Sequence, residues 1–513
     1  MKRVYCLLFT FICGSLIAQE QKQLSPADSV AAVNNALKAV EANPEDITAH
    51  ENYLKAVKFG RWGAPDNSTV IAQYDAWMKK YPRSVTVAYA IGHALAEKES
   101  PKARPYLLKA TEIDPDYDKA YFDLWIDAER WGDNKAANDF LLKAKKVNPK
   151  SADYAFYYAN TFSDSDVPQY QRLSLQVAKD FPKTERGAQA LYWIAERTGT
   201  VDQKISWYEQ QKKDFPPNEF GWTESGMASY FFLLLQTDPA KALQHAAYMK
   251  DIMNKDAEAV KEWSGNVVIA ESMIKAKDLL KEGKTAEAMK TAENVKVPRY
   301  SSAKEDIMLF RSYVAEAAGE KELAYKNILS AFVKEPSRKL LTELYKFAAK
   351  LNKSQKDADA DVWDARDTAA KQAPVFTLYN YFTKKPIALA DLKGKVVLLT
   401  YWFPGCGPCR GEFPHFENVV KKFKGKDFIY VGINIEPEQD EYVLPFMRST
   451  GYTFTPLRDT KEWKKGPLDN RNAAPVNFLI DRDGKIVFSN FRTDGKNEET
   501  LEMMISSMLT RKP

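Results

Sequence analysis

Cysteine is scarce in this chain, with only four among 513 residues. A fold held together by several disulfides is excluded, because such folds are rich in cysteine. Cys6 and Cys13 lie near the N-terminus, and the other two, Cys406 and Cys409, are separated by only two residues. A bridge between Cys406 and Cys409 would close a very short loop and would stabilise the fold little. This pair is therefore better explained by chemistry than by stability.

Long apolar runs and an excess of one charge are missing as well. After the N-terminus, no stretch reaches the roughly 18 uncharged apolar residues that a membrane-spanning helix requires. The 74 basic residues are nearly balanced by 69 acidic ones, which leaves a formal net charge of +5. So small an excess, with aromatic residues at helix-like spacings rather than among basic clusters, gives no case for binding nucleic acid.

The N-terminus has the pattern of a secretory signal peptide at residues 1–18. Lys2 and Arg3 precede the apolar stretch Val4–Ile17, which is too short to span a bilayer comfortably, and Ala18 is a suitable small residue before a cut. Neither N-terminal cysteine follows a small residue, so we do not expect a lipoprotein. The sequence predicts an exported protein that is soluble after cleavage and lies in the periplasm if the cell has one.

Residues 19–350 are rich in Ala, Leu, Lys and Glu and show no alternation typical of strands. Prolines recur in this region after a first step of 38 residues and then at steps of 33 or 34. A fixed period of about 34 residues is typical of stacked helix–turn–helix units, and each proline would follow a helix that it cannot continue. These prolines are Pro44, Pro82, Pro115, Pro149, Pro182 and Pro216.

One unit of this region shows the pattern best. The segment Asp118–Pro149 places Tyr121 and Leu124 on a first helix and Gly132 at a turn, with small residues on the second helix. It resembles tetratricopeptide (TPR) repeats, which implies an all-α solenoid with a concave surface for a partner protein or peptide. Trp125 stands where that family has a small residue. The alternative is a helical scaffold whose aromatic residues are simply core.

The composition changes after residue 350. Residues 351–371 are charged and rich in alanine and are expected to form a linker helix. In residues 372–513, apolar runs typical of strands alternate with helical patterns, which indicates an α/β domain. The expected strands are Phe376–Leu378, Val396–Phe403, Phe428–Ile435, Val476–Ile480 and Ile486–Phe488, and the expected helices are Glu412–Phe423, Tyr442–Ser449 and Glu498–Leu509.

The cysteine pair lies in the segment Val396–His415, VVLLTYWFPGCGPCRGEFPH. An apolar strand runs directly into Cys-Gly-Pro-Cys and a helical pattern follows, so Cys406 is predicted at a helix N-terminus. Unpaired backbone N–H groups and the helix dipole favour a thiolate at that position. Cys409, on the first turn of the helix, would lie within bonding distance of Cys406.

This segment resembles the thioredoxin superfamily, and within it the exported TlpA/ResA-like thiol–disulfide oxidoreductases. The likeness rests on Trp402 at the strand end, Pro414 in the following helix, Gly394–Lys395 before the strand, and the run Ala474–Asp481 (APVNFLID). It covers roughly residue 372 to the C-terminus. The fold it implies is multidomain, an all-α TPR-like helical solenoid followed by an α/β thioredoxin-fold domain.

The resemblance also implies roles for single residues. Cys406 and Cys409 would be the catalytic, redox-active pair. Pro475 would be cis and packed against the disulfide, with the backbone of Ala474 pairing to an extended substrate. Glu412 matches an acidic residue near the active site and would tune the cysteines or transfer protons. The alternative for Glu412 is an acid in the first helical turn that is favoured by the helix dipole.

Two residues depart from the pattern of that family. Gly405 precedes the first cysteine, where most relatives have Trp, and Thr400 stands where cytoplasmic thioredoxins bury an Asp that moves protons. The sequence does not show whether Glu412 replaces that Asp.

The function that the resemblance implies is that of an exported protein-disulfide reductase. Cys406 would attack a substrate disulfide, and Cys409 would resolve the mixed disulfide. The Gly-Pro pair between the cysteines is that of reducing thioredoxins, near about −270 mV, against about −120 mV for the oxidant DsbA. A reductase is therefore favoured over an oxidase or isomerase. It would need no cofactor beyond its disulfide, but it would need a membrane electron donor of the DsbD or CcdA kind.

Three other functions compete with this one. A zinc site needs four ligands, and His415 is the only further candidate nearby, so no metal is expected. A thioredoxin-fold peroxidase would carry its reactive cysteine in a different local motif, and this chain has no distant resolving cysteine. In an interaction protein, the helical region would do the work, and the thioredoxin-like domain would be a partner-binding module.

Overall fold

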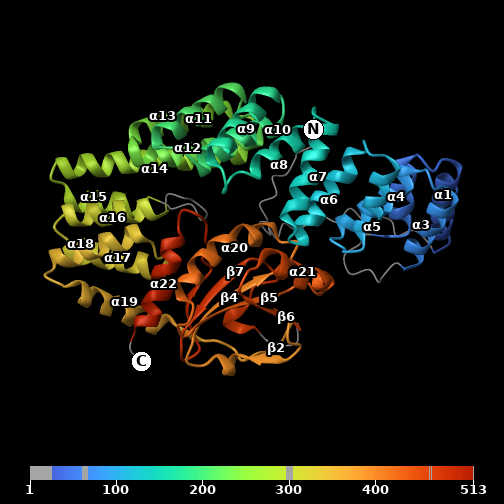
Figure 1. Cartoon of the computed structure of the whole chain (residues 1–513). Coiled ribbons are helices and arrows are strands. Elements are labelled where there is room, and N and C mark those ends of the chain that lie inside the picture. Colours follow the sequence, from blue (N-terminus) through green and yellow to red (C-terminus); the bar gives the residue numbers. More distant parts are fainter. Residues whose placement is uncertain (1–25, 60–67, 296–303, 461–462, 464, 512–513) are drawn as a thin grey trace.

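The computed structural model describes residues 26–59, 68–295, 304–460, 463 and 465–511. The predicted signal peptide, with Cys6 and Cys13, lies outside these residues. A long helical region comes first, and a mixed sheet with flanking helices follows it (Figure 1). The predicted multidomain fold, helical and then α/β, is confirmed. Among the described residues, no helix is both apolar enough and long enough to cross a membrane.

The helical region consists of helices joined by short turns. Those up to Pro216 are α1 (Pro26–Ala42), α2 (Ile47–Ala56), α3 (Ser68–Lys80), α4 (Val85–Glu97), α5 (Ala103–Ile113), α6 (Asp118–Arg130), α7 (Asn134–Val147), α8 (Ala152–Asn160), α9 (Val167–Asp180), α10 (Glu185–Arg197) and α11 (Val201–Asp214). Those that follow are α12 (Gly221–Thr237), α13 (Pro239–Ile252), α14 (Ala257–Lys281), α15 (Thr285–Glu293), α16 (Lys304–Ala317), α17 (Lys321–Lys334), α18 (Arg338–Lys350) and α19 (Gln355–Ala369).

Local chemistry explains where these helices begin and how closely they pack. The six periodic prolines all lie in turns, after α1, α3, α5, α7, α9 and α11, as predicted. Polar side chains cap many first turns; Ser84, for example, accepts a hydrogen bond from the Val87 N–H at the start of α4. Small residues allow close approach, since a Cβ at Gly92 would lie 2.9 Å from Leu107 Cδ2 of α5. Each helix therefore packs mainly on its neighbours in sequence.

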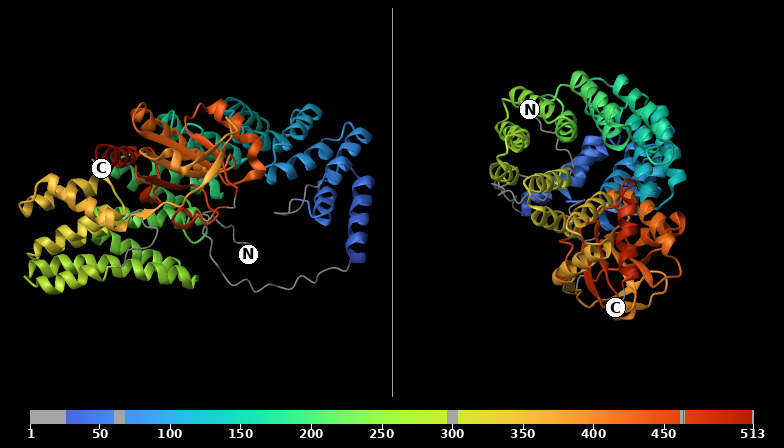
Figure 2. Two further views of the ribbon diagram at one scale, coloured as in Figure 1. Left: turned by 90° about the horizontal axis from the view of Figure 1, so that it is seen from below. Right: turned by 90° about the vertical axis from the view of Figure 1, so that its left-hand side faces the viewer.

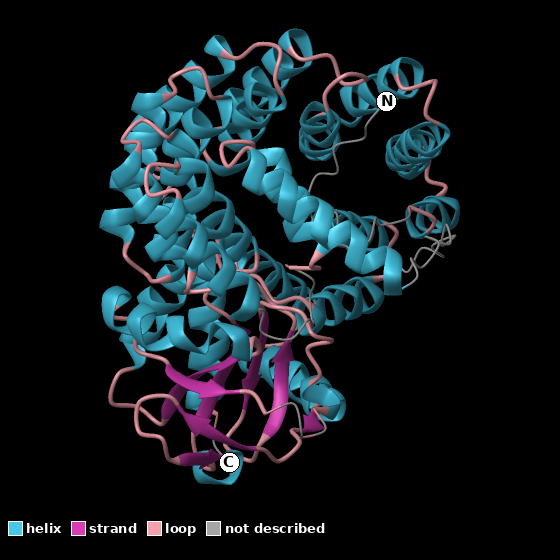
Figure 3. Cartoon of the chain, turned by 90° about the vertical axis from the view of Figure 1, so that its right-hand side faces the viewer, coloured by secondary structure: helices cyan, strands magenta, loops and turns pink. Residues whose placement is uncertain are grey.

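The helices follow a curved path that returns to the C-terminal domain. In two views, the helical region curves around an open centre, with the sheet at one side of the curve (Figures 2 and 3). Contacts of α4–α7 and of α17–α19 with the C-terminal domain lie at separate places: Tyr442 bonds to Asp127 of α6, whereas Phe488 packs on Arg366 of α19. The C-terminal domain therefore contacts well-separated parts of the helical region, including α10 through Lys496 and the Glu196 carbonyl.

The C-terminal domain is built on one eight-stranded sheet. Its strand order is β1-β8-β7-β4-β5-β6-β2-β3, with β4, β5 and β6 parallel and the remaining pairs antiparallel. The strands are β1 (Lys371–Gln372), β2 (Thr377–Asn380), β3 (Pro386–Ala388), β4 (Val396–Trp402), β5 (Phe428–Asn434), β6 (Thr455–Arg458), β7 (Val476–Ile480) and β8 (Lys485–Ser489). The helices are α20 (Gly407–Val420), α21 (Asp440–Thr450) and α22 (Glu498–Thr510).

Two apolar cores lie on opposite faces of this sheet, because side chains alternate along each strand. Leu398 and Trp402 of β4 pack with α20, α21 and α22, whereas Leu399 and Tyr401 pack with the segments around β2 and β6. Every residue of β4 is buried, as expected for a central strand. The rigid end of β4 therefore fixes the position of the cysteine motif that follows it.

Candidate active site

Cys406 and Cys409 lie where the central strand gives way to α20. Cys406 is the N-cap residue of this helix, and its Sγ accepts a hydrogen bond from the Cys409 N–H at 3.2 Å. The two residues form a disulfide, with Cα atoms 5.3 Å apart. The prediction that the first cysteine stands at a helix N-terminus is confirmed. A thiolate released there by reduction would face backbone N–H groups and the positive end of the helix dipole.

The cysteines are far less exposed than the two residues between them. Cys406 is 3% exposed and Cys409 is fully buried, whereas Gly407 and Pro408 are exposed. Open space surrounds Gly407, where an added Cβ would meet nothing within 4 Å. A substrate disulfide could therefore approach over the Gly407–Pro408 side of the motif.

Ala474 and Pro475, directly before β7, are the next residues of the predicted site. The Ala474–Pro475 peptide bond is cis, as predicted. Ala474 packs against the cluster of buried residues that contains Cys406 and Cys409. Ala474 thus lies against the same core as the disulfide, and the role of its backbone in binding an extended substrate stays a prediction.

Glu412 is buried beside the motif and is not a solvated acid of the first turn. It is 4% exposed on α20, and its Oε1 accepts hydrogen bonds from Arg492 Nε at 2.8 Å and from the Thr493 N–H at 2.9 Å. Its Oε2 accepts a bond from Asn477 Nδ2 at 3.1 Å. Burial raises the pKa of Glu412 above its ordinary value, and the charge of Arg492 and the hydrogen bonds oppose that rise.

Asn477 connects Glu412 to the central strand. The Thr400 hydroxyl of β4 donates a hydrogen bond to Asn477 Oδ1 at 2.5 Å, and the Asn477 amide donates to Glu412. The Glu412 carboxylate of α20 and the Asn477 amide of β7 thus form a polar group beside Thr400 inside this part of the core. Sequence reasoning missed Asn477, Arg492 and Thr493. The available signal was the polar Asn477 inside an otherwise apolar strand.

We expect Glu412→Gln to change how stability depends on pH. The folded chain holds the Glu412 proton more tightly than the unfolded chain does, because the folded pKa is raised. This contribution to stability is present below the unfolded pKa, about 4.3, and is lost as the pH rises through the folded pKa. The unfolding free energy of the wild type, relative to E412Q, should therefore fall as the pH rises from about 4 through the folded pKa of Glu412.

Urea unfolding at several pH values measures this difference. Glu499→Gln is a suitable control, since Glu499 is an exposed acid at the start of α22. A wild type that gains stability over E412Q as the pH rises would contradict the raised pKa.

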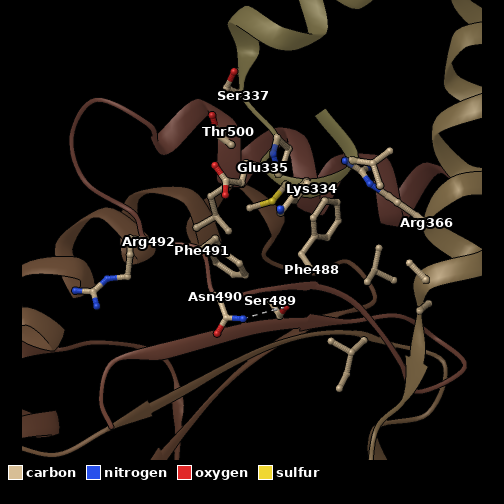
Figure 4. Close-up of a pocket in the computed structure, with 18 of the residues that line it drawn as sticks. Lys334, Glu335, Ser337, Arg366, Phe488, Ser489, Asn490, Phe491, Arg492 and Thr500 are labelled. Carbon is tan, nitrogen blue, oxygen red and sulfur yellow. Dashed lines mark hydrogen bonds between the residues drawn. The ribbon is translucent and has the colours of Figure 1, made fainter. Parts of the chain in front are cut away.

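A cavity separates this network from the helical region. It has a volume of about 530 Å³ and is lined by residues of β8, α22, α19 and the turn between α17 and α18 (Figure 4). Arg366 of α19 is 5% exposed, and its guanidinium carbon lies 4.3 Å from the centre of the Phe488 ring. Burial lowers the pKa of Arg366 to about 10. The cavity thus marks the second place where the two parts of the chain meet.

Two further residues of the segment around the motif, Trp402 and His415, contact other parts of the domain. Trp402 is fully buried against Phe413, Phe446 and Phe454, which supports core packing as its role. His415 Nδ1 lies 2.7 Å from a carboxylate oxygen of Glu498 on α22, so this histidine joins two helices of the domain.

Comparison with known proteins agrees with this geometry. The sequence profile of the AhpC/TSA family matches residues 369–489. The thiol-disulfide oxidoreductase ResA of Bacillus subtilis (strain 168) is 38% identical over 115 residues, which are 22% of this chain and 63% of that protein. ResA of Bacillus thuringiensis subsp. konkukian (strain 97-27) is 32% identical over 137 residues, 26% of this chain and 73% of that protein.

Solved structures include similar domains. A thiol:disulfide interchange protein of the thioredoxin family from Chlorobium tepidum TLS is 26% identical, with a TM-score of 0.25, and the match covers 27% of this chain and 97% of that one. The chain spans 63% of the length of the Bacillus subtilis relative. Through its C-terminal thioredoxin-fold domain, the chain belongs to the ResA/TlpA-like thiol–disulfide oxidoreductases.

Proposed function

We propose that the protein is an exported reductase of protein or peptide disulfides. The observation that supports this most strongly is the Cys406–Cys409 disulfide at the N-terminus of α20, in a domain of ResA type. The strand before it is fully buried, so the cysteines stand on a rigid support beside an exposed Gly-Pro pair. Such a site can exchange disulfides without a metal or an organic cofactor.

The reaction begins from the reduced form of the pair. The Cys406 thiolate attacks one sulfur of a substrate disulfide; the substrate S–S bond breaks, and its other sulfur leaves as a thiolate that takes up a proton. The Cys409 thiolate then attacks Cys406 Sγ, which releases the second substrate thiol. Two electrons have passed to the substrate, and the protein is left as the disulfide.

Glu412 is the candidate to accept the proton of the Cys409 thiol. It lies three residues beyond Cys409 on the same helix, hence on the same face, and its raised pKa lets a buried carboxylate hold and release a proton nearer neutral pH. Arg492 keeps this carboxylate in place through its 2.8 Å bond. Glu412 would thus prepare the resolving cysteine for attack.

Continued turnover requires an electron source. Because the proposed site acts outside the cytoplasm, a membrane donor of the DsbD or CcdA kind would have to reduce the Cys406–Cys409 disulfide again. The helical region would bind the substrate or a partner protein.

Reduction of insulin by the chain without its signal peptide tests this function. With dithiothreitol as the reductant, the wild type should accelerate the precipitation of insulin chains, and C406S should show only the rate of dithiothreitol alone. Insulin reduction that survives Cys406→Ser would refute the catalytic assignment. Hydrogen peroxide consumption by the wild type, lost in C406S, would instead favour a thioredoxin-fold peroxidase.

A further inference from the structure

The loop that leads into Cys406 is held from one side by a chain of hydrogen bonds that ends in the helical region. The Gly405 N–H donates to Gln439 Oε1 at 2.6 Å. Gln439, in the short helix η3 (Pro437–Gln439), uses its amide N–H to bind the Glu99 carboxylate. Glu99 lies in the turn between α4 and α5, 340 residues before Gln439. The backbone beside the first cysteine is thus connected to a distant acid.

A second chain of bonds holds the same loop from the other side. Arg410 of α20 donates from Nη1 to the Pro404 carbonyl at 2.9 Å, and its Nη2 pairs with Glu129 Oε2 of α6 at 2.7 Å. Glu129 is itself oriented by Trp125, whose Nε1 donates to its other oxygen at 3.1 Å. Two acids of the helical region therefore hold both Pro404 and Gly405, each through one side chain of the C-terminal domain.

Three further features bring the C-terminal domain and the helical region together near these bonds. A Cβ on Gly405 would lie 2.3 Å from Glu99 Oε2, so any larger residue would displace this carboxylate from its present position. Glu99 adopts a φ of +57°, in the left-handed region that costs free energy for a residue with a side chain. Nearby, the Tyr442 hydroxyl donates to buried Asp127 of α6 at 2.9 Å. The turn that contains this left-handed residue lies where the helical region meets the loop before Cys406.

We infer that Glu99 and Glu129 are positioning residues for the Cys406–Cys409 pair and act through Gln439 and Arg410. The consequence for catalysis rests on the proposed function. Both acids also affect the balance between disulfide and dithiol. A carboxylate beside Gly405 disfavours a thiolate at Cys406, and Glu129 neutralises Arg410, which would otherwise favour that thiolate. The helical region thus makes the pair a stronger reductant than the C-terminal domain would be alone.

The equilibrium of the disulfide with glutathione tests this role. Two glutathione thiols deliver two electrons and two protons to the Cys406–Cys409 disulfide, and the dithiol fraction is counted by alkylation and mass spectrometry. In the full chain carrying Glu99→Gln and Glu129→Gln, we expect the equilibrium to move toward the dithiol by up to about tenfold, or about 30 mV. Each single substitution should move it in the same direction by about two- to threefold.

The matched control removes two charges at positions farther from the loop. Glu97→Gln with Glu112→Gln changes two exposed acids that pair with His93 and Lys109 inside the helical region. Glutamine keeps the shape of glutamate, but Glu99 Oε1 also lies 3.4 Å from Nη2 of buried Arg130, so thermal unfolding of E99Q is measured beside the equilibrium to separate a loss of stability from a shift in the dithiol fraction. A dithiol fraction in E99Q/E129Q that equals that of the control pair would overturn the inference, as would a shift toward the disulfide.

This measurement is independent of the proposed function. An inactive wild type in the insulin assay would refute the reductase, yet the disulfide can still be equilibrated with glutathione in every variant. Equal equilibrium constants with an active wild type would refute the positioning role alone.

Discussion

Cys409→Ser is expected to abolish disulfide reduction and to leave the substrate covalently attached to Cys406. Without the second thiolate, the mixed disulfide has no neighbour to resolve it. Serine is close to cysteine in size, and the 3.2 Å hydrogen bond of the Cys409 N–H to Cys406 Sγ comes from the backbone. The attacking sulfur should therefore keep its position at the helix N-terminus.

Mass spectrometry under non-reducing conditions detects the trapped species. One adduct per C409S chain should form after a disulfide-containing peptide is added, and dithiothreitol should release it. The C406S/C409S double variant should form none. In living cells, the same C409S variant would retain native substrates for identification. Turnover by C409S at the wild-type rate would contradict the resolving role.

Trp402→Ala is expected to lower the unfolding free energy of the C-terminal domain by about 3–5 kcal/mol. Trp402 is fully buried at the end of β4, and its ring centre lies 5.1 to 5.4 Å from those of Phe413, Phe446 and Phe454. Truncation would leave a cavity beneath α20 and α21. Because Phe413 lies on the same helix as the cysteine pair, insulin reduction should fall as well.

Urea unfolding followed by near-ultraviolet circular dichroism measures this loss. Trp402→Phe is the control, because the phenylalanine ring would fill most of the space that the indole ring occupies. The indole Nε1 has no hydrogen-bond partner among the described residues, so removing it leaves no partner group unpaired. We expect W402F to lose less than half as much as W402A. Equal losses of unfolding free energy in W402A and W402F would contradict the prediction that filled volume at this position stabilises the domain.

Much of the C-terminal domain could be predicted because its signals are local. The strand β7 has the predicted bounds, and β4 and β5 differ from them by one residue at one end. β6 was missed. Pro456 interrupts its pattern, and a proline argues against a strand with neighbours on both sides. Pairing with β5 and β2 decides this strand, and no short window of sequence contains that information.

In the helical region and in the candidate site, too, local features could be predicted and long-range contacts could not. Periodic prolines located the turns up to Pro216, because a proline ends a helix wherever it stands. Beyond that point the long helix α14, of 25 residues, has no counterpart in a 34-residue unit, and only its helical character could be predicted. The surroundings of the Glu412 carboxylate were only partly predictable. Glu412 lies next to the Cys-Gly-Pro-Cys motif, whereas Arg492, which binds its carboxylate, is 80 residues further along the chain.

Gly405 has a consequence for exchanging modules between relatives. A Cβ at this position would lie 2.3 Å from Glu99 Oε2 and 3.0 Å from Gln439 Oε1, so a larger residue would push both side chains aside. A chimaera that joined this helical array to a catalytic domain with a larger residue at this position would have to displace the Glu99 and Gln439 side chains at the seam. A donor domain with glycine there could keep the bonds from Gly405 through Gln439 to Glu99, whereas a donor with a larger residue would lose them.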